Sequence, residues 1–227
     1  MIERTGWDRG LSVTADGKGL FGHAGAVLLR RLADGIGLTR GLAGVLPFSR
    51  VSCWRERAGV LVQLAVAIVL GARSVLEAEQ LQRHHQGLFG TPASDSTMRR
   101  LLTALDGTAL ARITKVRRRV RRHVWMLLNL RPGGFPWIEA AGRTLRGWVV
   151  VDLDATVITT ASRKEGAAGT FKGTFGFHPL GGWCANTGES LAMELRPGNA
   201  GANTVDDHLR VPAACLEQIP IPRSPSC

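Results

Sequence analysis

The spacing of apolar residues divides the chain into a helical first part and a strand-like second part. From Ala24 to about Ala104, apolar residues recur at intervals of three and four, which is the period of an amphipathic helix. This pattern predicts helices over 26–32, 57–72, 74–85 and 94–105. Ser74, followed three residues later by Glu77, forms a capping box at the start of the third helix. The glycines between positions 35 and 44 predict loops, and 87–92 predicts a turn.

Two of these helices, joined by a glycine-bearing turn, fit a helix-turn-helix module. Residues 97–105 would then be the recognition helix that enters a DNA groove. Pairs of helices with short turns are also common in proteins that bind no nucleic acid. The pattern therefore leaves two interpretations open, a DNA-binding module and an ordinary helical subdomain.

A further helical segment, after these four, carries an unusual charge distribution. Ile113, Val116, Val120, Val124 and Leu127 form an apolar stripe at helical spacing. Between Gly107 and Ile138 there is no acidic residue, but there are eight bases: Arg112, Lys115, Arg117, Arg118, Arg119, Arg121, Arg122 and Arg131. Solvated helices usually mix acids with their bases. The segment therefore predicts contact with phosphates, and the first seven of these bases are candidate DNA-binding residues.

Beyond this helix the pattern changes to that of strands. Residues 131–146 are rich in glycine and proline and predict a linker. Runs of β-branched and apolar residues predict strands over 147–160, 174–184 and 189–195, with a hairpin turn at 186–188. Asn203 or Thr204 would cap a final helix that ends near Gln218, and the proline-rich tail is expected to be unstructured. The fold class predicted is α+β.

The first of these strands carries two carboxylates on one face. Because side chains alternate along a strand, Asp152 and Asp154 share a face, while Val151, Leu153 and neighbouring apolar residues share the other. So many β-branched residues predict a central, buried strand, in which two ionised carboxylates need compensation. A divalent cation such as Mg²⁺ provides it directly. The alternative is that one of the two carboxylates ends the strand or pairs with an arginine.

Composition excludes several classes of protein. The chain has 227 residues, 29 basic and 18 acidic, with a net charge of +11, which favours a polyanionic partner. Codon bias toward arginine is an alternative source of this charge. The four cysteines form no CxxC pair, which argues against a zinc site and a disulfide framework and favours a reducing cytoplasm.

Residues 1–10 do not resemble a signal peptide, and the apolar segment 58–72 is too short to span a membrane. A formal GxGxxG at 17–22 is best explained as a turn.

Several motifs resemble one known family. DLDAT at 152–156, the segment KGTFGFHP at 172–179 and RPGNAG at 196–201 resemble bacterial insertion-sequence DDE transposases, of the group with a D-x-D-x-T strand. LFGTPASDSTMRRLL at 88–102 resembles the helical region that precedes their catalytic domain. The resemblance implies a helical DNA-binding region over 1–130, the linker over 131–146, and a ribonuclease H-like catalytic domain from 147 onward.

The resemblance also implies a site and its partners. In this family two Asp and one Glu hold two Mg²⁺ or Mn²⁺ ions, and the position of the first Asp corresponds to Asp154, with Asp152 as a second candidate ligand. Lys172 and His178 match basic positions near the DNA, although a loop lysine and a strand histidine would explain them equally well. The expected partner is double-stranded DNA with inverted repeats, with homo-oligomers as a candidate state, no membrane, and a cytoplasmic location at the nucleoid.

The family pattern is incomplete in this sequence. The second Asp and the Glu have no matching position, and Asp206 and Asp207 are explained by the dipole at a helix N-terminus. These observations predict a truncated, catalytically incomplete transposase, with the domain from 147 to 227 unfinished. Three hypotheses follow: a DDE transposase or its remnant, a non-catalytic DNA-binding protein that inhibits the full-length enzyme, and an unrelated basic α+β protein.

Overall fold

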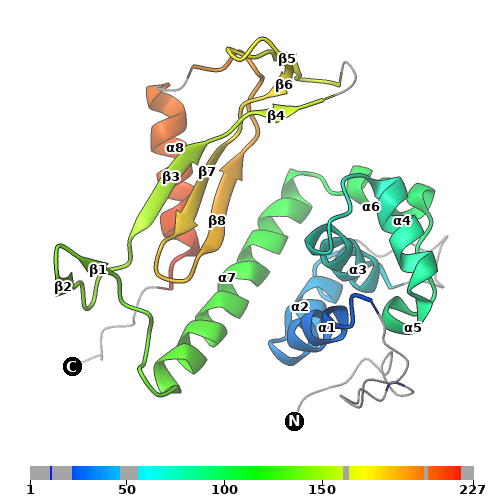
Figure 1. Ribbon diagram of the computed structural model, residues 1–227, viewed down its shortest axis with the longest axis horizontal. Coiled ribbons are helices and arrows are strands. Elements are labelled where there is room, and N and C mark those ends of the chain that lie inside the picture. Colours follow the sequence, from blue (N-terminus) through cyan, green and yellow to red (C-terminus); the bar gives the residue numbers. More distant parts are fainter. Residues whose placement is uncertain (1–10, 12–21, 47–55, 161–163, 202–203, 221–227) are drawn as a thin grey trace. The chain divides into compact units, whose positions relative to one another are not determined.

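The computed structural model describes residues 11, 22–46, 56–160, 164–201 and 204–220. Within this range the protein is a mixed α+β chain of helices and small antiparallel sheets (Figure 1). It forms two compact units, Met1–Val120 and Arg121–Cys227, so that the boundary falls inside one long helix. The predicted turn at 17–22, apart from its last residue, and the end of the proline-rich tail lie outside the described residues.

The described part of the first unit is helical. Its elements are α1 (Gly25–Gly35), α2 (Leu38–Ala43), α3 (Arg57–Val69), α4 (Val75–His84), α5 (Gln86–Phe89), α6 (Asp95–Thr103) and the first part of α7 (Gly107–Leu130). Helix α3 is buried on two faces. Val62 and Val66 join a cluster with Val116 of α7, and Val60 and Leu64 join another with Met98 of α6. This double burial explains why α3 is apolar nearly all round.

The helix predictions for this unit are confirmed, with two differences. Ser74 caps α4, and its side chain accepts a hydrogen bond from the backbone N–H of Glu77. The segment with four glycines, predicted as loops, contains α2. Gly41 explains the difference, because a Cβ at this position would lie 2.6 Å from a methyl group of Val116. The glycine is therefore present for close helix packing, which sequence spacing alone does not distinguish from a turn. The predicted turn at 87–92 likewise contains part of the short helix α5.

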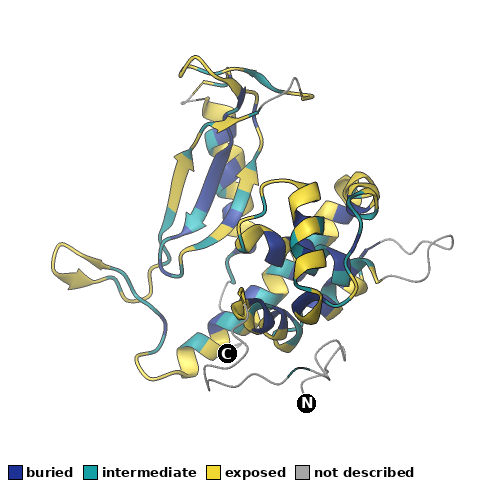
Figure 2. Ribbon diagram, turned by 45° about the vertical axis from the view of Figure 1, so that its right-hand side comes forward, coloured by how far each residue is buried: buried dark blue, intermediate teal, exposed yellow. Residues whose placement is uncertain are grey.

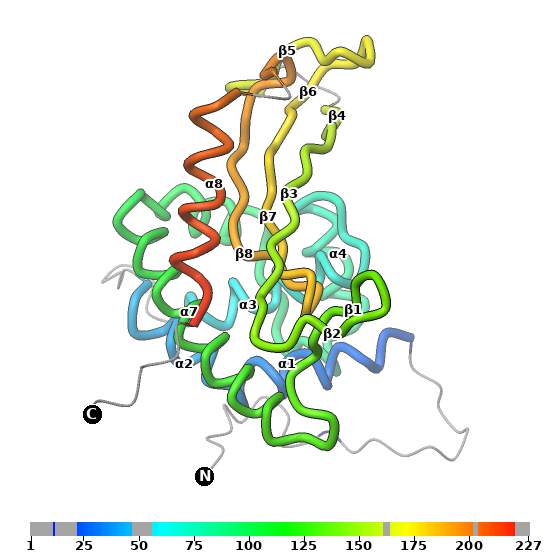
Figure 3. The backbone as a smooth tube through the Cα atoms, turned by 90° about the vertical axis from the view of Figure 1, so that its left-hand side faces the viewer, coloured from blue at the N-terminus to red at the C-terminus, as the bar shows by residue number. Residues whose placement is uncertain are grey.

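The second unit contains two three-stranded antiparallel sheets and a covering helix. One sheet has the order β3 (Val151–Ala155), β7 (Leu180–Cys184), β8 (Glu189–Glu194), and the other has β4 (Ile158–Thr159), β6 (Phe175–Phe177), β5 (Ala168–Gly169). Because β3 continues into β4 and β6 into β7, these strands form one long ribbon that joins the sheets (Figure 3). Helix α8 (Val205–Gln218) packs on the first sheet, where Val211 and Cys215 contact Leu180, Cys184 and Leu191.

The segment predicted as a linker contributes to the core of this unit. It contains a hairpin, β1 (Glu139–Ala140) with β2 (Arg143–Thr144). Phe135, which precedes the hairpin, is buried against Trp125 of α7, with 4.9 Å between the ring centroids. Trp125 and Leu128 therefore anchor the end of α7 to the hydrophobic core of the second unit. Leu127, which is predicted to be in the apolar stripe, is 45% exposed.

The predicted burial of the strand with the two carboxylates is wrong. Strand β3 is the edge strand of its sheet among the described residues, and Asp152, Leu153 and Asp154 are all exposed. The buried central strand is β7 (Figure 2). A run of β-branched residues indicates a strand but does not give its place in the sheet, because that place depends on pairing with residues far along the chain.

Candidate active site and nucleic-acid interface

Five of the predicted DNA-binding bases lie on one exposed face of α7. Lys115, Arg118, Arg119 and Arg122 follow the spacing i, i+3, i+4 and i+7, and Arg112 lies one turn earlier on the same face. All five side chains are exposed. We call this set the basic stripe. With no acid anywhere on α7, the stripe has the geometry of a surface that neutralises a row of phosphates. Arg117 is only half-exposed and lies on a different face.

Arg121, also predicted to bind DNA, is directed into the protein. Its side chain is 4% exposed, and its Nε lies 2.8 Å from Oε2 of Glu189 in β8. The same guanidinium donates to the backbone carbonyl and to Oε1 of Gln218 in α8, at 3.2 and 2.7 Å, and to the Ser190 carbonyl at 3.2 Å. The other oxygen of Glu189 accepts a hydrogen bond from the indole N–H of Trp125 at 2.7 Å. Arg121 thus joins α7, β8 and α8.

The two carboxylates of β3 lie on the face of the sheet opposite α8. Leu153 pairs with Gly182, and a Cβ at Gly182 would meet both Cys215 of α8 and Leu153, so this pair faces the helix. By alternation, Asp152 and Asp154 face the other way, as their spacing predicts. Asp152 pairs with Trp183, and Asp154 pairs with Gly181. The sharing of one face of β3 by Asp152 and Asp154 is therefore as predicted, although the burial of the strand is not.

A tryptophan ring lies beside the carboxylates. A Cβ at Gly181 would approach the Trp183 ring to 2.3 Å, so the indole lies directly over Gly181, which is the partner of Asp154 in the sheet. No motif in the sequence singles out Trp183. Its alternation with Gly181 along a predicted strand is a signal that the two share a face, but only the register of β7 against β3 places them next to Asp154.

Two carboxylates side by side on an exposed face fit a hard divalent cation. Mg²⁺ commonly binds one or two carboxylates and keeps several of its waters, and exposed carboxylates leave room for those waters. One oxygen of Asp154 accepts a hydrogen bond from the backbone N–H of Ala155 at 2.8 Å, and this bond fixes its orientation. Within the described ranges, no group of three or more His, Cys, Asp or Glu side chains is arranged to hold a metal ion.

The two other predicted DNA-binding residues occupy different environments. Lys172 is exposed in the turn between β5 and β6, and its Nζ lies 5.7 Å from the centroid of the Phe171 ring. His178 is 4% exposed, and its Nδ1 lies 3.0 Å from the carbonyl oxygen of Ala200. Its backbone also exchanges hydrogen bonds with Arg196. These contacts give His178 a structural role between β6 and β7, and its role in DNA binding stays a prediction.

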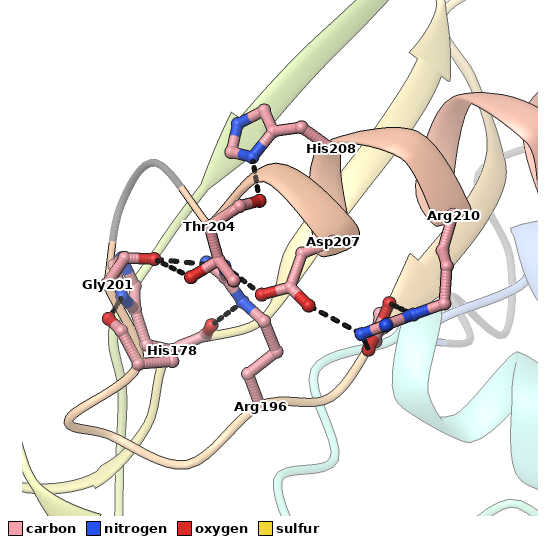
Figure 4. Close-up of polar contacts among 9 residues, drawn as sticks. His178, Arg196, Gly201, Thr204, Asp207, His208 and Arg210 are labelled. Carbon is pink, nitrogen blue, oxygen red and sulfur yellow. Dashed lines mark hydrogen bonds and ion pairs between the residues drawn. The ribbon is translucent and has the colours of Figure 1, made fainter.

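Arg196 and Asp207 form a buried ion pair at the start of α8 (Figure 4). Arg196 Nη1 lies 2.9 Å from one oxygen of Asp207, and it also donates to the Gly201 carbonyl. The second oxygen of Asp207 contacts Arg210, which in turn bonds to Glu194. The hydrogen bond from Arg196 is the main reason that the pKa of Asp207 lies below its usual value. Asp207 thus holds α8 to the end of β8, a role beyond the dipole effect expected from the sequence.

We expect the lowered pKa of Asp207 to make stability depend on pH in acid. A carboxylate with a lowered folded-state pKa contributes stability above its unfolded pKa and loses it as pH falls through the folded value. Asp207→Asn should therefore lower the free energy of unfolding at neutral pH and reduce its dependence on pH below about 4. Urea titrations between pH 7 and pH 2.5 measure both effects. Asp206→Asn, one position earlier and exposed, is the control, and equal acid dependence in all three proteins would contradict the assignment.

Asn186 is a second residue whose role the sequence did not reveal. It is part of the predicted hairpin turn between β7 and β8. Its side-chain oxygen accepts a hydrogen bond from the backbone N–H of Val150 at 2.9 Å, and its Nδ2 donates to the carbonyls of Pro136 and Trp148. These bonds fix the segment that leads into β3, and so help to position the two carboxylates. No local pattern reports them, because the partners lie far away in the sequence.

A basic helix face and a pair of aligned strand carboxylates are features expected of enzymes that act on nucleic acid with metal ions. The family model for the transposase DDE domain, group 1, matches residues 4–219, and the chain therefore belongs to this family of DDE transposases. DDE transposase domains generally use divalent metal ions. No curated protein and no solved structure matches the chain. None of the described helices is both long enough and apolar enough to cross a membrane.

Proposed function

We propose that this protein is the transposase of an insertion sequence and binds the inverted repeats at the ends of its element. The observation that carries the proposal is its membership of the DDE transposase family over nearly its whole length. This membership removes the hypothesis of an unrelated basic protein whose arginines reflect codon bias alone. A DNA substrate further implies a location in the cytoplasm at the nucleoid.

The basic stripe supports the proposed DNA binding. Five exposed cations on one side of a single helix can contact successive phosphates without base specificity. Helix α6 is the candidate for reading sequence, since Ser94 caps its N-terminus and Arg99 and Arg100 are exposed on it. Inverted repeats present two sites related by a two-fold axis, and a dimer matches such symmetry. We therefore include a homo-oligomer in the proposal.

Asp154, with Asp152 as its neighbour, is the proposed metal-binding pair. Mg²⁺ or Mn²⁺ held there would activate a water or a 3′-hydroxyl for in-line attack on a DNA phosphate and stabilise the leaving oxygen. Asp154 and Asp152 would supply the negative charge that binds the ion, and the exposed sheet face leaves space for a DNA strand. Three antiparallel strands followed by a helix, as in β3, β7, β8 and α8, support a ribonuclease H-like domain.

We further propose that the chain, by itself, is catalytically incomplete. Three other acids near this sheet are paired with arginines: Asp207 with Arg196, Glu189 with Arg121, and Glu194 with Arg210. None of these three is therefore available to complete the site around Asp154. A chain of this kind would bind element ends without cutting them, and it would inhibit an active copy by occupying the same DNA. This is the second candidate function.

The test uses the purified 227-residue chain and a DNA duplex that contains the end sequences of the element that encodes this protein. We expect salt-sensitive, sequence-selective binding and no strand cleavage in Mg²⁺ or Mn²⁺. Cleavage that Asp154→Asn abolishes would refute the proposed incompleteness and establish the enzyme. Binding equal to that of unrelated duplex DNA would contradict the proposed recognition of element ends. Inhibition of an active transposase of the same element by an excess of this chain would support the second candidate.

A further inference from the structure

The turn between β5 and β6, residues 170–174, is closed by several hydrogen bonds and carries an exposed aromatic ring. The Thr170 backbone N–H donates to the Thr174 carbonyl at 2.7 Å, and the Gly173 N–H donates to the Thr170 carbonyl at 3.0 Å. The two threonine hydroxyls also lie 2.7 Å apart. Gly173 has a φ of +72°, which glycine adopts without strain. The backbone of this turn is therefore held in one conformation.

The strands that support the turn are held equally closely. A Cβ at Gly176 would lie 2.0 Å from the Ile158 carbonyl oxygen, and a Cβ at Gly198 would lie 2.3 Å from the Ala168 carbonyl oxygen. Glycine at both positions lets β4, β6, β5 and the 196–201 segment pack backbone against backbone. The turn is consequently a fixed extension of the sheet.

Phe171 is exposed on this fixed support. Its side chain is 73% exposed, and its ring lies 5.6 Å from the buried ring of His178, centroid to centroid. Lys172 Nζ lies 5.7 Å from the centroid of the same ring. The turn thus presents an aromatic face and a cation together. Burial in the core does not account for this phenylalanine.

We propose that this turn binds an unpaired DNA base, with Phe171 stacking on the base and Lys172 contacting the adjoining phosphate. Every base has an apolar face that stacks on an aromatic ring, and each base is followed by a phosphate within reach of a neighbouring cation. Bases inside a duplex are already stacked on one another, so the ring can reach only a base at a strand end, in a gap or turned out of the helix. The inference rests on the proposed function, because DNA strands are opened at the element ends that a transposase binds.

The experiment compares the affinity of the 227-residue chain for a blunt duplex, for the same duplex with a two-nucleotide overhang, and for a single-stranded oligonucleotide. Fluorescence anisotropy gives each dissociation constant. The overhang should improve affinity about tenfold, the effect of stacking one base. Phe171→Leu should remove this preference and leave blunt-duplex binding unchanged, whereas Phe171→Trp should retain it. For the overhang duplex, Lys172→Gln should lower the magnitude of the slope of log affinity against log salt concentration by about one.

Trp148→Leu is the matched control, because Trp148 is also an exposed aromatic residue of the second unit, at 68% exposure. It should keep the preference for the overhang. Equal affinity of the wild-type chain for the blunt and overhang duplexes, or an unchanged preference in Phe171→Leu, would overturn the proposal. If the chain does not bind the blunt duplex, that result contradicts the proposed function and not the role of Phe171. The role of Phe171 is then tested by comparing the affinities of the wild-type chain and Phe171→Leu for the single-stranded oligonucleotide. Circular dichroism of each variant checks the fold.

Discussion

Replacing Arg121 with alanine is expected to lower the free energy of unfolding of the second unit by about 3 kcal/mol. The substitution removes the donors that Arg121 supplies to Glu189, Gln218 and the Ser190 carbonyl, while the Trp125 indole N–H still donates to Glu189. Removing one partner of a buried ion pair costs about 3–5 kcal/mol. The lower end applies here, because the side chain of Glu189 is one-third exposed and water can partly replace the arginine.

Urea unfolding followed by tryptophan fluorescence measures this effect, since Trp125 and Trp137 belong to the core of the second unit. Arg122→Ala is the matched control. It removes the same side chain one position later, where the arginine is exposed, and should change stability by less than about 0.5 kcal/mol. Similar unfolding midpoints for the two variants would contradict the assigned role of Arg121.

Neutralising the basic stripe is expected to give the largest change in DNA binding. Each phosphate contact contributes about 0.9 to the slope of log affinity against log salt concentration. Substituting glutamine for all five bases of the stripe should therefore lower the magnitude of that slope by up to about 4.5 and weaken binding to any duplex. Gel shifts or anisotropy at several salt concentrations provide the slope.

A variant with the same change in net charge tests whether location matters. Five exposed arginines outside both the stripe and α6 are suitable for substitution by glutamine: Arg73, Arg83, Arg131, Arg143 and Arg146. Arg83 has a surface ion pair with Glu79, and such pairs contribute little to stability. This control should keep most of the salt slope. Equal losses in the two variants would show that total charge, and not the face of α7, controls DNA binding.

The charge pattern of the acid-free segment, residues 107–138, predicts a helix but not the direction of each basic side chain. Helical spacing and the absence of acids identified a basic helix, and the structure has a helix over Gly107–Leu130. The sequence could not separate Arg121 from Arg122, because both are arginines in the same run. Val116 and Val120 pack in the core of the first unit, whereas Trp125 and Leu128, on a different face of α7, pack in the core of the second unit. Arg121 is turned inward because it lies on the face that packs in the core of the second unit.

The sequence by itself determined what depends on local geometry. Alternation along a strand placed Asp152 and Asp154 on one face and Leu153 on the other, and capping chemistry located the start of α4. These features need only the backbone period and neighbouring residues. The motifs around the two carboxylates likewise sufficed to identify the family.

Tertiary structure alone decided what depends on distant partners. Pairing with β7 made β3 an exposed edge strand and set Trp183 over Gly181 beside Asp154. Packing placed His178 inside the protein and Phe171 outside it, although both belong to one short segment of sequence. The physical reason is the same in each case. Burial and sheet position are set by contacts between residues far apart along the chain, and such contacts leave no local periodic signal.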